Sequence, residues 1–136
     1  MIEIAVFCMA LNVFHEARGE SFDGQQAVAL VTWNRAGKRK DKVCEVVTKD
    51  RQFSWTADKL QLTSKGYRLK KGAYPKKQEK AAWRSAVFVA ELVMKNKVPD
   101  FTHGSTHYHA NYVRPQWAKS MKLTRVVGRH IFYRIA

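Results

Sequence analysis

Apolar residues in the first part of the chain recur with the period of a helix. Their spacing of i, i+3, i+4, i+7 and i+10 places them on one helical face. The residues that form this face are Ile4, Phe7, Cys8, Leu11 and Phe14. The pattern predicts a helix over residues 3–17, and Gly19 offers a point for it to end.

Three further segments have helical patterns. A second helix is expected from Asp23 to about residue 37, because Asp23 at the N-cap with Gln26 three residues later resembles a capping box. A shorter helix is expected over residues 42–49. A long one is expected over residues 75–96, with Pro75 in its first turn. The intervening residues 50–73 are polar and irregular, and a loop of this length is often functional or contains short elements of its own.

The C-terminal third has strand patterns instead. Residues 106–113 are short and aromatic, and residues 123–127 and 130–134 flank Gly128-Arg129, which could turn a hairpin. Helices therefore come first and a small antiparallel sheet comes last, which predicts an α+β fold. With 136 residues in all, we expect a single domain spanning 1–136.

The charge balance is strongly basic. Lys and Arg number 25 against 11 Asp and Glu, for a formal net charge of +14. So strong a positive field indicates an anionic partner, such as nucleic acid, anionic lipid or a bacterial cell-wall polymer. No apolar run approaches the roughly 18–20 residues that span a bilayer, so we expect no stable membrane insertion.

The two cysteines, Cys8 and Cys44, are isolated in the sequence. Two cysteines in 136 residues do not form a disulfide framework, so we expect two buried free thiols and synthesis in a reducing compartment. No basic segment precedes the apolar stretch at the N-terminus, and no secretory leader is indicated.

Glu16 is the first candidate for chemistry. It ends an otherwise apolar helix, and burial raises a carboxyl pKa toward the range of a general acid at neutral pH. Glu20 and Asp23 lie close in sequence and could supply a second carboxylate of a glycosidase. A zinc-protease motif fails because position 19 is Gly where a second His would be needed.

A second candidate segment, residues 103–109, contains three histidines. They could ligate zinc, but neither cysteine is near and no carboxylate lies close in sequence, so we expect no metal site. A polar and aromatic cleft wall suits these residues better. Residues 52–55 and 115–117 add similar material, and sugars present apolar ring faces with hydroxyl edges.

Taken together, these segments resemble the SleB/CwlJ-type cell wall hydrolases. The resemblance runs from about residue 8 to the end, in the same order and spacing. It rests on residues 16–20, 24–29 with 34–35, 52–55, 104–117 and 128–133.

The resemblance implies a fold similar to lysozymes and lytic transglycosylases, and cleavage of peptidoglycan glycan strands without a cofactor. It implies that Glu16 is the catalytic acid. The expected substrate-binding residues are Glu20, Ser54, Trp55, Thr106, His107, Tyr108, His109 and Tyr112. Whether the product is a 1,6-anhydro sugar or a reducing end stays open, as does the role of Glu20 or Asp23.

A bare, highly basic catalytic domain looks like a phage endolysin. That likeness implies a monomer made in the bacterial cytoplasm without a signal peptide, which acts on peptidoglycan after release. Two other classes of function remain as alternatives. One is a nucleic-acid-binding module, although no known nucleic-acid-binding motif is visible. The other is a wall- or membrane-binding protein without catalysis, using the helix expected over residues 75–96.

Overall fold

The computed structural model describes residues 3–49, 59–63, 66–72 and 75–136. In these residues the α-helices are α1 (Ile4–Ala17), α2 (Phe22–Arg35), α3 (Lys40–Thr48) and α5 (Lys80–Met94). The strands are β1 (Leu60–Thr63), β2 (Gly66–Leu69), β3 (His107–Ala110), β4 (Met121–Val127) and β5 (His130–Ile135). Two short 3₁₀-helices are η2 (Lys77–Glu79) and η3 (Gln116–Ser120).

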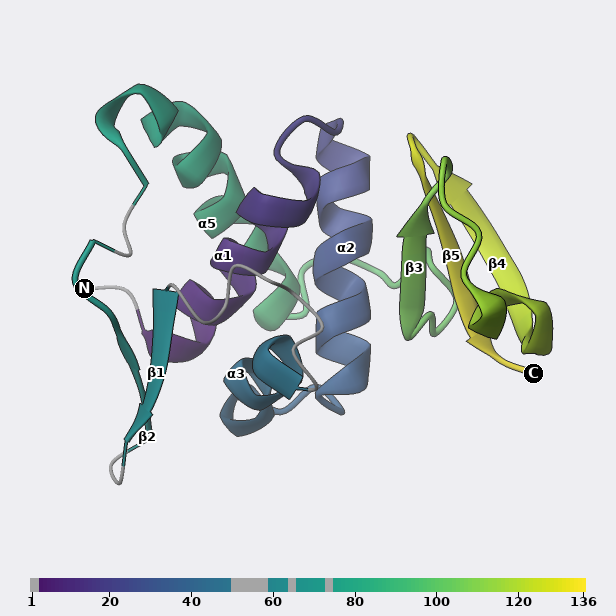
Figure 1. Cartoon of the computed structure of the whole chain (residues 1–136), viewed down its shortest axis with the longest axis horizontal. Coiled ribbons are helices and arrows are strands. Elements are labelled where there is room, and N and C mark those ends of the chain that lie inside the picture. The colour runs from purple at the N-terminus through teal and green to yellow at the C-terminus, as the bar shows by residue number, and fades with distance from the viewer. Residues whose placement is uncertain (1–2, 50–58, 64–65, 73–74) are drawn as a thin grey trace.

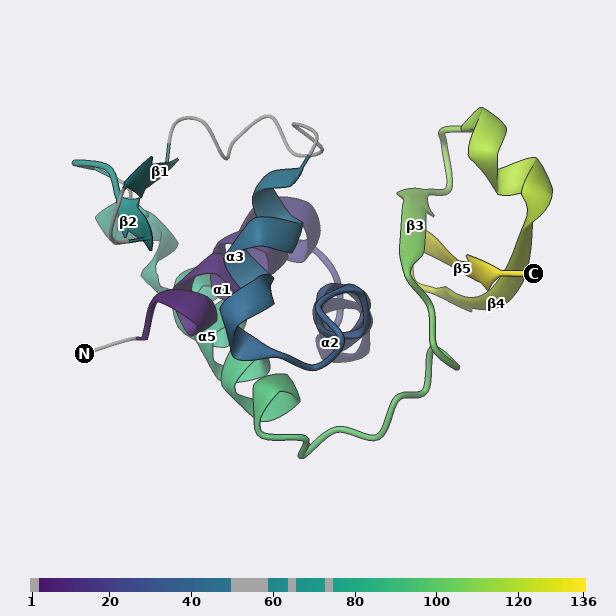
Figure 2. The same ribbon diagram turned by 90° about the horizontal axis from the view of Figure 1, so that it is seen from below.

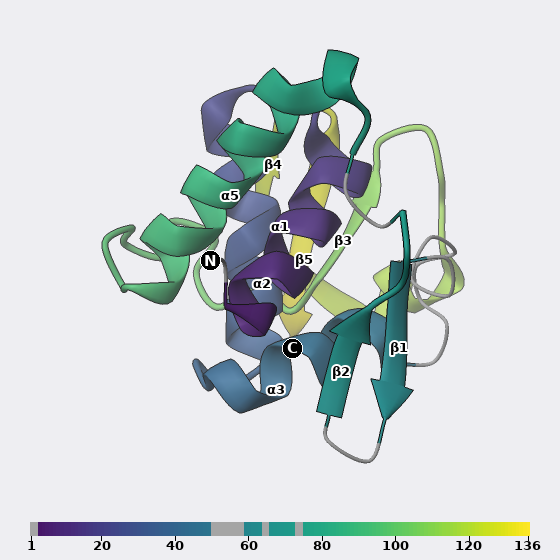
Figure 3. The same ribbon diagram turned by 90° about the vertical axis from the view of Figure 1, so that its left-hand side faces the viewer.

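The molecule has a helical half and a sheet half. Helix α1 packs against α2, α3 and α5, and the C-terminal sheet stands on the far side of α2 with β3 nearest to the helix (Figures 1 and 2). All pairs in this sheet are antiparallel, in the order β3-β5-β4. The small β1–β2 hairpin lies on the opposite side of the helices (Figure 3). This arrangement confirms the predicted α+β fold.

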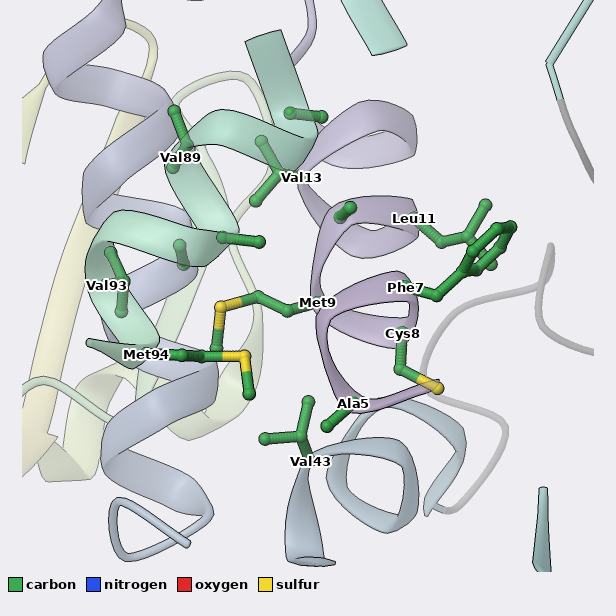
Figure 4. Close-up of a cluster of buried hydrophobic side chains, with 14 of the residues drawn as sticks. Ala5, Phe7, Cys8, Met9, Leu11, Val13, Val43, Val89, Val93 and Met94 are labelled. Atoms are coloured by element: carbon green, nitrogen blue, oxygen red, sulfur yellow. The ribbon is translucent and has the colours of Figure 1, made fainter. Parts of the chain in front are cut away.

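Helix α1 forms the centre of the helical core. The expected face is buried apart from Ile4, but so are residues on the other sides of the helix, including Met9 and Val13, both with no exposed surface. Met9 lies beside Met94 of α5, and Val43 of α3 lies below them (Figure 4). A helix that is apolar on all sides is surrounded by protein. The prediction of a single apolar face therefore underestimated how much of α1 is buried.

Cys8 and Cys44 are joined in a disulfide, so the expectation of two free thiols is wrong. The bond links α1 to α3 across 36 residues, with the two Cα atoms 5.3 Å apart. Helix packing brings the two positions to bonding distance, and this proximity could not be read from two isolated cysteines. The bond also removes the support that free thiols lent to a reducing compartment.

Two local predictions also need correction, and a third gains detail. Helix α2 is capped by Ser21, whose hydroxyl accepts a hydrogen bond from Gly24 N at 3.2 Å, while Asp23 lies in the first turn. Pro75 precedes the helical residues, which begin at Lys77 with η2. The polar segment contains the β1–β2 hairpin, whose strands of 4 residues each are too short to give a clear alternating pattern.

A second, smaller apolar cluster docks the sheet onto α2. Phe132 of β5 is fully buried and packs with Ala27, Val28 and Val31 of α2. Polar contacts reinforce the docking, since Asn34 Nδ2 at the end of α2 donates to the backbone oxygen of Ser105 at 2.9 Å. The sheet is therefore held at a defined place along α2.

The disulfide generates a prediction for stability. Reduction of the Cys8–Cys44 bond should lower the free energy of unfolding by about 2–4 kcal/mol, because the unfolded chain gains the freedom of the opened loop. Urea unfolding with and without dithiothreitol measures this. The Cys8→Ala, Cys44→Ala double variant is the control and should not respond to reductant. An unchanged midpoint for the reduced wild type would contradict the prediction.

Candidate active site

A cavity of about 410 Å³ lies between the helical half and the sheet. Helix α1 contributes Glu16 from its last turn, and α2 contributes Arg35. The opposite wall comes from β3, the loop that follows it, and His130 at the start of β5. The cavity therefore exists only where the two halves meet.

The side chain of Glu16 is partly buried from solvent. Burial raises the pKa of its carboxyl group, and a hydrogen bond from Tyr108 opposes this rise only in part. The Tyr108 hydroxyl lies 3.4 Å from Glu16 Oε1. Burial and the neighbouring Glu16 charge raise the pKa of Tyr108 well above its usual value, so its hydroxyl keeps its proton and remains a donor. A carboxyl group with a raised pKa is suited to donate a proton near neutral pH.

Successive side chains of β3 point to opposite sides of the strand, so the residues of this cleft wall make different contacts. Tyr108 points toward α1, whereas His107 and His109 both contact the ring of Trp117, at centroid distances of 5.2 and 5.7 Å. His109 Nε2 is also 2.8 Å from the hydroxyl of Tyr133. These rings line the same cavity as Glu16, and aromatic and imidazole rings of this kind accept the apolar face of a sugar.

Glu20 is held by the turn between β4 and β5. Its side chain is only 5% exposed, and Arg129 donates to it from the backbone N at 2.8 Å and from Nε at 2.9 Å. Burial acts to raise the pKa of Glu20, but the hydrogen bonds and charge of Arg129, together with His130, outweigh it and leave the pKa lowered. A Cβ at Gly128, where φ is +57°, would lie 2.7 Å from Glu20 Oε1. A side chain at position 128 would displace the Glu20 carboxylate, and glycine adopts this positive φ without strain.

The structure brings together some of the expected substrate-binding residues and separates others. Those that line the Glu16 cavity are His107, Tyr108, His109 and Tyr112. Glu20 lines a neighbouring cavity of about 190 Å³ that also includes Glu16. Thr106 is not among the lining residues of the Glu16 cavity, and its hydroxyl lies 2.9 Å from His107 Nδ1. Ser54 and Trp55 lie outside the described residues.

The cavity also contains residues that were not singled out from the sequence as binding residues. Arg35 follows Val31 by one helical turn on α2, and both line the cavity. That spacing was a usable signal for Arg35. Trp117 belongs to residues 115–117, which were expected to add to the cleft wall, whereas His130 was noted only within the C-terminal motif of the resemblance, because strand pairing alone brings β5 beside β3. Asp23, the other candidate second carboxylate, lines a different cavity with Phe101 and Arg125.

In the part of the chain that the structure describes, no group of three or more His, Cys, Asp or Glu side chains could hold a metal ion. Within the same residues, no helix is both long and apolar enough to cross a bilayer.

Comparison with known proteins places the chain in a family. Residues 19–133 match the family described as Cell Wall Hydrolase. The chain therefore belongs to the cell wall hydrolase family, which confirms the resemblance noted from its motifs. No curated protein sequence matches the chain.

Two solved structures share the fold. One is the catalytic domain of the germination-specific lytic transglycosylase SleB from Bacillus anthracis, with a TM-score of 0.67 and 24% identity over 98% of this chain and 97% of that one. The other is the catalytic domain of the Bacillus cereus SleB protein, with a TM-score of 0.58 and 23% identity over 98% of this chain and 93% of that one. At these identities the comparison establishes the shared fold.

The Glu20–Arg129 contact predicts a pH dependence. Because the pKa of Glu20 is lowered by folding, its contribution to stability is present above the unfolded pKa of about 4.3 and is lost as the pH falls through the lower folded value. Glu20→Gln should lose less stability than wild type on acidification below about pH 4.3. Urea unfolding at several pH values measures this. Glu45→Gln, on the exposed face of α3, should keep the wild-type slope, and equal slopes for all three proteins would refute the prediction.

Proposed function

We propose that this cell wall hydrolase cleaves the glycan strand of peptidoglycan with Glu16 as its general acid and base. The observation that carries the proposal is the position of Glu16, at the end of a buried helix and facing an aromatic cleft, with its pKa raised by burial. The family and the SleB-like fold support the same substrate class. The net charge of +14 fits a wall polymer that carries carboxylates and phosphates.

The proposed first step is proton transfer from Glu16 to the glycosidic oxygen between N-acetylmuramic acid and N-acetylglucosamine. The bond from the muramyl C1 to that oxygen breaks, and the N-acetyl oxygen of the substrate relieves the positive charge at C1. Glu16, now a carboxylate, takes the proton from the muramyl 6-hydroxyl. The oxygen of that hydroxyl group forms the new bond to C1. The product is a 1,6-anhydro sugar, and no water is consumed.

Within the described residues, Glu16 is the only carboxylate that lines the 410 Å³ cavity. Glu20, the nearest candidate for placing a water molecule, is engaged by Arg129 through both of its oxygens. This favours the reaction that needs a single carboxylate, a lytic transglycosylase. The alternative is a muramidase, in which a positioned water would attack C1 and leave a reducing end.

Glu16→Gln tests the central assignment. The variant should lose roughly 10²–10⁴ in the rate of glycan cleavage, because an amide cannot deliver the proton. Mass spectrometry of digested peptidoglycan measures both the rate and the product, since an anhydro product is one water lighter than a hydrolytic one. Glu91→Gln on α5 is the control and should remain active. Full activity in Glu16→Gln would refute the proposal and would favour a non-catalytic wall-binding protein.

Tyr108→Phe tests how Glu16 is tuned. The tyrosine hydroxyl acts to lower the pKa of Glu16, so its removal should raise that pKa and move the alkaline limb of kcat/KM to higher pH. The pH profile on purified peptidoglycan measures this shift. Tyr67→Phe is the control, because the Tyr67 hydroxyl lies 2.9 Å from Thr48 Oγ1 and does not contact Glu16. An alkaline limb that stays in place or moves to lower pH would contradict the prediction.

We also propose, from the likeness to endolysins, that the protein is a monomer that reaches the wall from the bacterial cytoplasm by release. The Cys8–Cys44 disulfide is compatible with activity in an oxidising space outside the cytoplasm.

A further inference from the structure

Positive charge is distributed unevenly over the chain. Residues 101–136 contain no Asp or Glu, and their cations are Arg114, Lys119, Lys122, Arg125, Arg129 and Arg134. Arg129 is paired with Glu20, and Arg125 lies over the ring of Phe101 at 6.0 Å. Among the described residues, the other four make no ion pair. The sheet half therefore presents cations whose charge is not neutralised within the fold.

Two of these cations line a second cavity next to the Glu16 cavity. Arg114 lies in the loop after β3 and Lys119 lies in η3, and both border a space of about 400 Å³. The short helix η3 and its loop lie farther from α2 than β3 does (Figure 2). The shared lining residues of the two cavities are His109, Val113 and Pro115. The two cavities therefore adjoin at these three residues.

The second cavity combines an apolar floor with a cationic rim. Tyr133 and Ile131 of β5 and Ala118 of η3 supply apolar surface, while Asn111 adds an amide. Arg114 and Lys119 are exposed, and no carboxylate is among the lining residues. This chemistry suits a short peptide with small apolar side chains and free carboxylates better than it suits an uncharged sugar, which has no group for the two cations.

We infer that this second cavity binds the stem peptide of the muramyl residue whose bond is cleaved. The inference rests on the proposed function, because that function places a peptide-bearing sugar in the Glu16 cavity. Arg114 and Lys119 would meet the peptide carboxylates, and the apolar floor would meet its alanine methyl groups. The enzyme would then distinguish peptide-bearing glycan from bare glycan through residues that take no part in proton transfer.

The test compares two substrates with wild type and a double variant. The substrates are purified peptidoglycan and the same glycan after an amidase has removed its stem peptides. Wild type should cleave the peptide-bearing strand with a kcat/KM about tenfold or more above that for bare glycan, because two charge-assisted contacts are lost with the peptide. Arg114→Ala, Lys119→Ala should lose this preference and match wild type on bare glycan.

A charge-matched control separates local binding from the general positive field. Lys42→Ala, Lys95→Ala removes the same charge from α3 and from the end of α5, where each lysine makes an exposed pair with a glutamate, and should keep the wild-type preference. Equal losses in both double variants, or a loss by Arg114→Ala, Lys119→Ala on both substrates alike, would overturn the inference.

Two further measurements keep the test decisive. The free stem peptide should inhibit wild type on peptide-bearing strands, and an absence of inhibition together with no substrate preference would overturn the inference without any variant. Cleavage of neither substrate by wild type, or cleavage of both by Glu16→Gln, would instead mark a failure of the proposed function.

Discussion

The attachment of the sheet to helix α2 is the constraint on which the site depends. Glu16 belongs to the helical half, while Tyr108 and the aromatic wall belong to the sheet half. Burial of Phe132 against α2 holds the halves together, and removing such a side chain from water stabilises the fold by roughly 1.5–3 kcal/mol. Hydrogen bonds from Asn34 to Ser105 and from Arg129 to Glu20 are directional, so they fix the orientation in which the two halves make this apolar contact. The geometry of the candidate active site is therefore set by the docking of the sheet half onto helix α2.

The core and the chemistry also share helix α1. Its residues from Phe7 to Phe14 are all buried, and its last turn carries Glu16 into the cleft. A densely packed helix has little freedom to shift, so the carboxyl group is presented from a rigid base. Asn12, one turn before Glu16, is fully buried and donates to Thr32 Oγ1 of α2 at 3.2 Å, which fixes the rotation of α1 relative to α2. The environment that raises the pKa of Glu16 is thus built by the same packing that stabilises the fold.

Periodicity in the sequence predicted the elements with a strong apolar pattern. Helix α1 and the β4–β5 hairpin with its turn at Gly128-Arg129 lie where they were expected, within one or two residues. The β1–β2 hairpin was not predicted because each of its strands has only 4 residues, too few for a clear alternation of apolar and polar positions. The cap of α2 was misassigned by two residues, since Ser21 and Asp23 are both good capping residues and only backbone geometry distinguishes them.

The candidate site shows the same division between local and long-range information. Glu16 was found from its motif and its place at the end of an apolar helix. Its contact with Tyr108, 92 residues away, and the engagement of Glu20 by Arg129, 109 residues away, depend on docking that no local pattern encodes. For the same reason the pairing of Cys8 with Cys44 could not be inferred from spacing alone.

That disulfide makes a covalent ring of the segment from Cys8 to Cys44, and Glu16 lies inside the ring. A single proteolytic cut anywhere in the ring would open the backbone but leave the two fragments tethered through sulfur. After a cut beyond α1, the helix that carries Glu16 would stay attached to both pieces. The ring would therefore let the packing of the helical core hold both fragments in place after a cut that would otherwise separate them.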